Sequence, residues 1–355
     1  MTGIRVLIAD DSPMVRNMLA DILASDPGIS VAGVAGNGLQ AIEQTRLLKP
    51  DIVAMDINMP VMGGLEAIEK IMSTTPVPIL VITDLDDARV AFSALSKGAL
   101  DVYHKSFYDQ SMAAELIAKV KLLSRVKVIR HILPKEGETG VAPRPLEQIK
   151  NSSPLPSASR RKESRKALLQ LVAIASSTGG PRALAQIFSE MREGFPVPIV
   201  VAQHVSDGFV NGLVEWLDSV TPIKVKFAAD REPLRKNHVY FAPAGMHIMV
   251  KADARLALVA APPEDLFHPS CNLLLASAGK AFGAQSLGVI LTGMGDDGVE
   301  GLRSIRKCGG YTVAQDESTS VVFGMPKVAI DKGLIDKVCP LGEISGLLKQ
   351  LAERE

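Results

Sequence analysis

Ser177, His204 and Asp297 are the side chains of this 355-residue chain whose types and settings point most directly to chemistry. Each comes shortly after an apolar run with the composition of a buried strand. A serine beside a histidine can attack an acyl carbon, because the imidazole takes the hydroxyl proton and later delivers it to the leaving group, while a carboxylate orients the imidazole. The sequence therefore predicts a hydrolytic site if the three strands are parallel neighbours.

The residues that follow Ser177 suit the start of a helix. Thr178 leads into the segment Gly179-Gly180-Pro181. Proline is favoured in the first helical turn, and the glycines let the backbone approach a substrate closely. Free N–H groups at a helix N-terminus can stabilise a developing oxyanion. Our candidates for this support are Thr178 and the main-chain N–H of Met294, which lies in the glycine-rich turn before Asp297.

Spacing alone leaves alternatives open. Ser176 is nearly as good a nucleophile as its neighbour, and Asp296 is nearly as good a third member. The Ser-Thr-Gly-Gly turn could bind phosphate, although the full Gly-x-Gly-x-x-Gly fingerprint and the P-loop lysine are absent. A single histidine after a strand is often structural, and the segment Gly-Met-Gly-Asp-Asp-Gly could be a tight turn or a metal loop.

The N-terminal third carries a second set of polar side chains at the ends of strand-like runs. Three carboxylates around one pocket form an all-oxygen site suited to Mg²⁺, which accepts few protein ligands. A carboxylate beside bound Mg²⁺ can attack a phosphoryl group, and a hydroxyl and an ammonium group can then hold the phosphate oxygens. Helix capping or turn formation explains any one of these residues alone, but not five at compatible positions. The set consists of Asp10, Asp11, Asp56, Thr83 and Lys105.

Alternating strand and helix patterns divide the chain into two α/β domains, each predicted to be a doubly wound parallel sheet. In such sheets functional groups gather beyond the carboxyl ends of the strands. Residues 1–124 form the first domain and residues 168–355 the second. Residues 125–167, rich in proline, serine and basic side chains, read as a linker.

Two finer expectations concern local structure. The start of the linker, near residues 122–132, keeps a helical pattern. Residues 224–259 of the second domain suggest added β-hairpins, with turns near residues 236–237 and 244–245.

Composition limits the classes of function. Lys and Arg (39) balance Asp and Glu (39), so no overall field favours nucleic acid or an anionic membrane. The N-terminal segment lacks the features of a signal peptide, and no apolar run approaches the ~18 residues of a membrane span. Cys271, Cys308 and Cys339 have no metal-type spacing. We therefore expect a cytoplasmic protein without a disulfide or a structural metal, and without insertion into a membrane.

Residues 4–124 resemble the receiver domain of two-component response regulators, a flavodoxin-like fold. The similarity is carried by Asp10-Asp11, by Met55-Asp56-Ile57-Asn58-Met59-Pro60, by Gly63-Gly64, by Thr83 and by Lys105. The resemblance implies that Asp56 accepts the phosphoryl group, that Asp10, Asp11, Asp56 and the Asn58 main-chain carbonyl surround Mg²⁺, and that Thr83 and Lys105 are switch residues. In the family a proline usually follows the lysine, whereas this chain has Ser106, and residues 83–87 are unusually acidic. Both departures bear on the coupling between phosphorylation and output.

Residues 168–350 are similar to the catalytic domain of the chemotaxis receptor methylesterases, the protein-glutamate methylesterase family. The matching segments are 175–180, 201–204, 241–247, 268–270, 291–298, 314–320 and 323–326. The motif selects Ser177, the serine directly before Thr-Gly-Gly, and Asp297, the residue before Gly298. Cys271 stands where the family more often has an aliphatic residue, and we interpret it as a packing residue with no base beside it.

The resemblance implies a serine hydrolase that removes γ-methyl esters from glutamates of a chemoreceptor's cytoplasmic domain and also deamidates glutamines there. It implies a histidine kinase as phosphodonor, Mg²⁺ for phosphorylation and no cofactor for hydrolysis. In the family the unphosphorylated receiver covers the active site, and phosphorylation relieves the block. We expect a monomer. The rival hypothesis is a response regulator that signals through protein binding, with the second domain as a docking surface.

Overall fold

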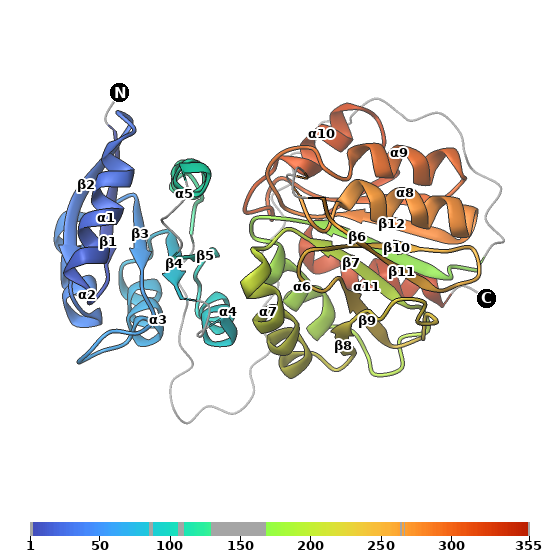
Figure 1. The fold of residues 1–355 in the computed structure, drawn as a ribbon, viewed down its shortest axis with the longest axis horizontal. Coiled ribbons are helices and arrows are strands. Elements are labelled where there is room, and N and C mark those ends of the chain that lie inside the picture. Colours follow the sequence, from blue (N-terminus) through green and yellow to red (C-terminus); the bar gives the residue numbers. More distant parts are fainter. Residues whose placement is uncertain are drawn as a thin grey trace, which may run out of the picture.

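Two parallel β-sheets flanked by helices, with one small separate hairpin, make up the described part of the chain in the computed structural model (Figure 1). The structure describes residues 3–84, 88–105, 110–128, 168–262, 265 and 267–353. The predicted fold class, two α/β domains with parallel sheets, is confirmed.

The first sheet has five parallel strands in the order β2-β1-β3-β4-β5. The strands are β1 (Ile4–Ala9), β2 (Ile29–Ala35), β3 (Ile52–Met55), β4 (Ile79–Thr83) and β5 (Asp101–His104). β3 and β4 are buried along their whole length, as expected for strands covered on both faces.

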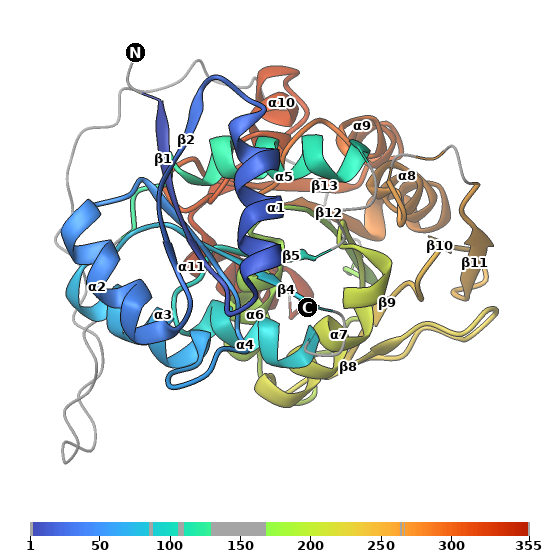
Figure 2. The same cartoon turned by 60° about the vertical axis from the view of Figure 1, so that its left-hand side comes forward.

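Helices cover both faces of this sheet in the described part of the chain (Figure 2). On one face lie α1 (Pro13–Ala24) and α5 (Gln110–Leu123), and on the other lie α2 (Gly38–Leu48), α3 (Gly64–Thr74) and α4 (Ala88–Ser96). α1 begins where the sequence predicts, because Pro13 occupies the first turn and the Ser12 hydroxyl accepts a hydrogen bond from the Val15 N–H.

The second sheet has seven strands in the order β14-β13-β12-β6-β7-β9-β8, and every pair in it is parallel. Its strands are β6 (Leu171–Ser176), β7 (Ile199–Gln203), β8 (Lys224–Phe227), β9 (His238–Phe241), β12 (Ser286–Ile290), β13 (Tyr311–Gln315) and β14 (Lys337–Cys339). The helices are α6 (Gly180–Ser189), α7 (Asp207–Val220), α8 (Cys271–Phe282), the 3₁₀ turn η2 (Gly283–Gln285), α9 (Val299–Lys307), α10 (Met325–Asp331) and α11 (Leu341–Ala352). A separate antiparallel hairpin joins β10 (Met246–Val250) and β11 (Leu256–Ala260).

The expected hairpins in residues 224–259 are only partly right. β8 and β9, on either side of the turn at residues 236–237, pair in parallel rather than as a hairpin. β9 is buried on both faces between β7 and β8, which is the setting of a parallel strand. The turn at residues 244–245 connects two different sheets, and the real hairpin turns at residues 251–255.

The expected helix near residues 122–132 is wrong as far as the structure describes this segment. α5 ends at Leu123, and residues 124–128 are not helical. The Ser124 hydroxyl donates to the Lys121 carbonyl, a local bond of the kind that competes with a continuing helix. Residues 129–132 lie outside the described residues, as does most of the linker, so the domain limits 1–124, 125–167 and 168–355 stay a prediction.

The two domains meet where α4 packs against α7 (Figures 1 and 2). The Phe92 ring stacks on Trp216 at a centroid distance of 5.9 Å and meets Phe209 edge-on at 6.2 Å. A Cβ on Gly212 of α7 would lie 2.6 Å from backbone atoms of Ala88 and Arg89 in α4. The close approach of these helices therefore depends on the missing side chain at residue 212. Within the described residues, no helix is long and apolar enough to cross a bilayer.

Candidate active site

Three neighbouring strands bring the predicted hydrolytic residues to one edge of the second sheet. β12 pairs with β6, and β6 pairs with β7, all in parallel. Ser177 follows β6, His204 follows β7, and Asp297 lies in the loop after β12. The His204 N–H donates to the Ser176 carbonyl at 3.0 Å, which holds two of these loops together. The requirement that the three strands be parallel neighbours is met.

His204 and Asp297 form a hydrogen-bonded pair. Nε2 of His204 lies 2.9 Å from Oδ2 of Asp297. Both side chains are almost fully buried, at 9% and 8% exposure. Nδ1 of His204 has no hydrogen-bond partner in the part of the chain that the structure describes. With the Nε2 proton donated to Asp297, Nδ1 is the nitrogen free to accept a proton.

The N-terminus of α8 holds the Asp297 carboxylate. The main-chain N–H groups of Cys271 and Asn272 donate to it at 2.7 and 2.9 Å, and the Ser270 hydroxyl donates at 3.3 Å. Burial opposes ionisation of Asp297, but the hydrogen bonds from His204 and from this helix start outweigh it and hold the pKa below its ordinary value. Asp297 is therefore a persistent anion beside the imidazole.

The Ser177 loop is braced from both sides. The Gln203 side chain accepts from the Ser176 hydroxyl at 2.7 Å and donates to the carbonyls of Ser177 and His204 at 2.9 and 2.8 Å. The Ser177 N–H donates to the Thr292 carbonyl at 3.1 Å. A Cβ on Gly293 would lie 2.7 Å from the Ser177 Cβ, so only glycine fits there. These contacts fix the serine relative to both neighbouring loops.

The two candidate oxyanion donors lie beside the serine. Thr178 immediately precedes Gly179, whose φ of 78° turns the chain into α6. Met294 is 47% exposed and lines the same cleft as Ser177 and Thr178. Within the described residues, neither the Thr178 N–H nor the Met294 N–H donates a hydrogen bond to the backbone. Both donors are therefore available to a substrate oxygen.

The structure separates the alternatives that spacing left open. Ser176 is fully buried, and its hydroxyl is committed to Gln203. Asp296 is exposed, whereas Asp297 is 7% exposed and bound to His204. Ser177 and Asp297 thus have the better geometry for the hydrolytic roles.

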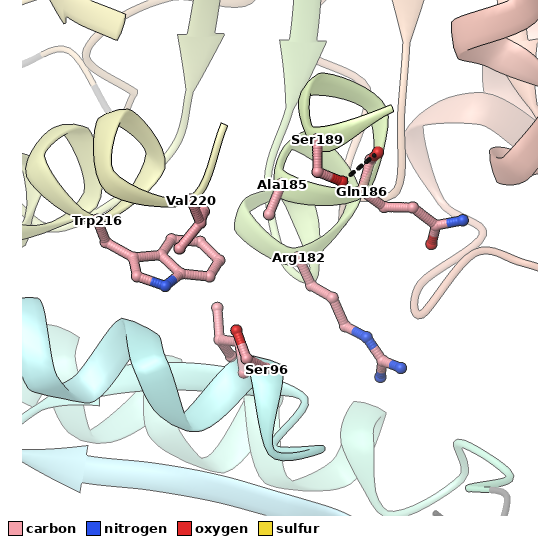
Figure 3. A pocket seen from close by; sticks show the side chains of 8 residues that line it. Ser96, Arg182, Ala185, Gln186, Ser189, Trp216 and Val220 are labelled. Carbon is pink, nitrogen blue, oxygen red and sulfur yellow. Dashed lines mark hydrogen bonds between the residues drawn. The ribbon is translucent and has the colours of Figure 1, made fainter. Parts of the chain in front are cut away.

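The cleft at this site lies between the two domains and has a volume of about 480 Å³. Tyr103, Glu115 and Lys119 line it from the first domain, opposite Ser177 and His204. A second pocket of about 250 Å³ is also lined by both domains (Figure 3). Its lining residues are Leu95 and Ser96 of α4, Arg182, Ala185, Gln186 and Ser189 of α6, and Trp216 and Val220 of α7. The first domain therefore covers the catalytic edge of the second.

The acidic cluster of the first domain gathers around Lys105. The Lys105 ammonium lies 2.8 Å from Asp10 Oδ2 and 3.0 Å from Asp56 Oδ1. Burial, supported by the charge of Asp10 and opposed by Lys105, raises the pKa of Asp56 to about 6. Oxygens of Asp10, Asp11 and Asp56 lie within 4.8 Å of one another, which suits a hard cation such as Mg²⁺.

Two other members of the predicted receiver set lie at the same edge. The buried Thr83 hydroxyl has no hydrogen-bond partner among the described residues. Asn58 is exposed and lies two residues beyond Asp56 in the segment that follows β3. Ser106 and residues 85–87, on which the expected changes in coupling rest, lie outside the described residues.

The interpretation of Cys271 needs a correction. Its side chain is fully buried in the core, as expected of a packing residue. The expectation that no base lies beside it is wrong, because Sγ lies 3.4 Å from Nε2 of His204. The sequence does not indicate this contact, because Cys271 lies 67 positions after His204, at the start of α8.

Sequence reasoning also missed side chains that support the pair. The Phe267 ring stacks on His204 at a centroid distance of 4.5 Å. Nδ1 of His247 accepts from the Ser270 N–H at 3.0 Å, and its Nε2 lies 2.9 Å from Asp265. A signal for the α8 start was present, since Pro269-Ser270 before an apolar run is typical of a helix N-terminus.

Family models and full-length relatives match both domains of the chain. Residues 6–117 match the family model of the response regulator receiver domain, and residues 172–348 match that of the CheB methylesterase. A relative from Anaeromyxobacter dehalogenans (strain 2CP-C), protein-glutamate methylesterase/protein-glutamine glutaminase 2, is 42% identical and covers 98% of this chain and 97% of its own. Protein-glutamate methylesterase/protein-glutamine glutaminase 3 of Paramagnetospirillum magneticum (strain ATCC 700264 / AMB-1) is 41% identical, covering 98% and 96%. The crystal structure of the Thermotoga maritima CheB methylesterase catalytic domain is 38% identical with a TM-score of 0.49, covering 52% of this chain and 98% of that chain.

A receiver domain whose partner domain carries a serine, a histidine and an aspartate on one sheet edge defines a response regulator with a hydrolase output domain. The chain belongs to the protein-glutamate methylesterase/protein-glutamine glutaminase family.

Proposed function

We propose that this protein is a phosphorylation-activated hydrolase that demethylates glutamate γ-methyl esters, and deamidates glutamines, on the cytoplasmic domain of a chemoreceptor. The observation that carries the proposal is the buried Asp297–His204 pair beside Ser177 on three adjacent strands. The name of these relatives, protein-glutamate methylesterase/protein-glutamine glutaminase, supports both substrates. Such a site acts in the cytoplasm, where the receptor's methylated helices lie.

In the proposed reaction, the Ser177 hydroxyl attacks the ester carbon and its proton passes to Nδ1 of His204. Asp297 accepts the Nε2–H bond and stabilises the imidazolium. The tetrahedral oxyanion takes hydrogen bonds from the Thr178 and Met294 N–H groups. The C–O bond to the methoxy group then breaks, and the His204 proton leaves with it as methanol.

Water completes the cycle by the same route. It gives a proton to Nδ1 of His204 as it attacks the acyl-serine, and the serine takes that proton back when it leaves. Glutamate is the product in both cases, because an ester and an amide pass through the same type of tetrahedral intermediate and differ only in releasing methanol or ammonia. Hydrolysis in this scheme uses the chain's own side chains.

The receiver edge would hold Mg²⁺ through Asp10, Asp11, Asp56 and the Asn58 carbonyl, and its donor set of hard oxygens fits that ion. Bound Mg²⁺ would neutralise charge on the incoming phosphoryl group. The Asp56 carboxylate accepts that group from a histidine kinase, and the Thr83 hydroxyl and the Lys105 ammonium bind its oxygens.

Regulation follows from the elements that join the phosphorylation site to the cleft. His104 directly precedes Lys105, and its ring lies 5.7 Å from that of Phe209 in α7. α4 begins five residues after Thr83 and carries Phe92 to the same aromatic cluster. A shift of Thr83 and Lys105 toward a phosphoryl group therefore acts on the contact that keeps the cleft covered, which is a two-state element biased by local charge.

The test measures methanol released from a methylated receptor fragment. Ser177→Ala should lower turnover at least about a thousandfold, because the enzyme can no longer form the acyl-serine intermediate. Ser176→Ala, one residue earlier, is the matched control and should retain measurable turnover. Normal methanol release by the Ser177→Ala enzyme would favour the rival hypothesis of a docking surface.

A further inference from the structure

Cys271 places a thiol against the His204–Asp297 pair. Its Sγ lies 3.4 Å from Nε2 of His204, and Nε2 lies 2.9 Å from Oδ2 of Asp297. One ligand atom from each of the three residues falls within 4.8 Å of the others. The proposed hydrolytic mechanism uses the imidazole and the carboxylate but gives the thiol no role.

The three groups form a mixed nitrogen, sulfur and oxygen set. Zn²⁺ accepts all three at roughly 2.0–2.3 Å, which places tetrahedral ligands roughly 3.3–3.8 Å apart. The observed separations of 2.9 and 3.4 Å are within a few tenths of an ångström of that spacing. Three protein ligands with a fourth position for water is a common zinc arrangement. Hard Mg²⁺ prefers oxygen ligands and has little affinity for a thiolate.

We propose that His204, Cys271 and Asp297 form a binding site for a thiophilic divalent cation such as Zn²⁺, and that the bound cation switches off hydrolysis. The first part rests only on the geometry of the three side chains. The second part rests on the proposed function, since it assigns His204 the role of the base.

Occupancy and catalysis exclude each other through the imidazole. The cation takes the Nε2 lone pair, so the neutral ring carries its proton on Nδ1 instead. Nδ1 can then no longer accept the Ser177 proton. The Asp297 Oδ2 lone pair that accepted the Nε2–H is freed for the cation, while the N–H groups of Cys271 and Asn272 keep the carboxylate in place. Binding releases one proton, from the Cys271 thiol.

Without the cation, the thiol is not a competing nucleophile. Burial, reinforced by the nearby Asp297 charge, raises the pKa of Cys271 well above its ordinary value. The Sγ donates to the Ala202 carbonyl at 3.4 Å, which keeps it directed at the edge of β7. A neutral thiol packed in the core leaves hydrolysis to Ser177 until a cation displaces its proton.

The direct test titrates Cd²⁺ into the full-length, chelator-treated protein and follows the ultraviolet absorption of cadmium–thiolate bonds. Excess Mg²⁺ occupies the all-oxygen site of Asp10, Asp11 and Asp56, so the titration reports on the thiol site. The expected result is one equivalent of tight binding that is lost in Cys271→Ala and Cys271→Ser. Cys308→Ser, at an exposed cysteine, is the matched control and should retain the signal.

The second arm measures methanol release at increasing Zn²⁺, with each variant compared with its own metal-free rate. In the wild type and in Cys308→Ser, Zn²⁺ should lower turnover by about tenfold or more. Cys271→Ala should need at least about tenfold more Zn²⁺ for the same inhibition, because it removes a direct ligand and loss of even an outer partner of a ligand costs about ten- to a hundredfold in metal affinity. Equal inhibition of all variants by Zn²⁺ would overturn the proposed site. So would the absence of an absorption change when Cd²⁺ is added to wild-type protein, or an equal change in wild type and Cys271→Ala, provided that their circular dichroism spectra agree. A cadmium–thiolate signal from a protein that releases no methanol would leave the site standing and refute the proposed function instead.

Discussion

Asp56 and Asp297 both stand beyond the carboxyl end of a buried strand in a parallel sheet, yet their surroundings act on them in opposite directions. Asp56 is 3% exposed beside Asp10, and burial raises its pKa to about 6. Asp297 is buried to a similar degree, but the start of α8 and His204 lower its pKa. The same sheet geometry thus produces one carboxylate whose ionisation is opposed and one whose ionisation is favoured.

The difference matches the roles proposed for the two residues. A carboxylate that orients an imidazole must remain an anion, so main-chain N–H donors compensate its burial. A carboxylate that receives a phosphoryl group can instead remain unfavourable to ionise, because a bound cation can neutralise its charge and phosphorylation then changes that charge. Three substitutions test this contrast.

The largest effect is expected from Asp297→Asn. The amide keeps the shape of the carboxylate but not its charge, so it no longer selects the imidazole tautomer that leaves Nδ1 free. Turnover should fall by about 10⁴-fold in a methanol-release assay. Asp296→Asn, at the exposed neighbour, is the control and should stay close to the wild type. Equal losses from both variants would mean that the loop matters and the buried charge does not.

Asp56→Asn should remove activation by phosphodonors and stabilise the receiver. The native pKa of Asp56 lies near 6, above the unfolded value of 3.8, so the folded state binds the proton more tightly. The ionised group therefore costs up to about 3 kcal/mol above pH 6, and that cost disappears as the pH falls toward 4. In Mg²⁺-free buffer at pH 7 the variant should gain most of this amount.

The free energy of unfolding of the receiver can be measured by urea denaturation, with hydrogen exchange at the β1 and β3 amides as the probe. The difference between Asp56→Asn and the wild type should shrink between pH 6 and pH 4. Asp11→Asn, which changes an exposed carboxylate of the same cluster, should gain much less. A gain that does not depend on pH would contradict the assignment to Asp56 ionisation.

A smaller effect is expected where the two domains meet, at the contact of α4 with α7. Gly212→Ala adds a methyl group that would lie 2.6 Å from the backbone of α4, so the covered state must shift or open. Overpacking of this kind costs about 1–3 kcal/mol, which lowers the ratio of covered to open protein about fivefold or more. Methanol release without a phosphodonor should rise, up to the phosphorylated rate.

Alanine suits a helix better than glycine, so this variant should not weaken α7 itself. Gly346→Ala is the control, because its added methyl in α11 meets nothing within 4 Å. An unchanged basal rate in Gly212→Ala would show that the α4–α7 contact does not limit access to Ser177.

The reactive side chains could be found from the sequence because each follows an apolar strand and parallel strands gather their ends. Ser177, His204 and Asp297 needed only β12, β6 and β7 to be neighbours. The same logic located the acidic cluster of the receiver. Such patterns can be found in the sequence because a buried strand requires a run of apolar residues, and the polar residue that ends the run marks the edge of the sheet.

The remaining features depend on segments that meet only in three dimensions. The N–H cradle of Asp297 and the thiol of Cys271 come from α8, and no spacing rule links that helix to His204. The parallel pairing of β8 with β9 depends on burial between neighbouring strands rather than on turn residues. The packing of α4 against Gly212 is a contact between the two domains, and the periodicity of the sequence does not indicate which helices of different domains meet.

Control of hydrolysis by phosphorylation is tested most directly by comparing methanol release from a methylated receptor fragment with and without a small-molecule phosphodonor and Mg²⁺. The donor should raise release by the wild type and leave Asp56→Asn at its basal rate. If wild-type protein shown to carry the phosphoryl group on Asp56 released methanol no faster than without the donor, phosphorylation would not control the hydrolytic site.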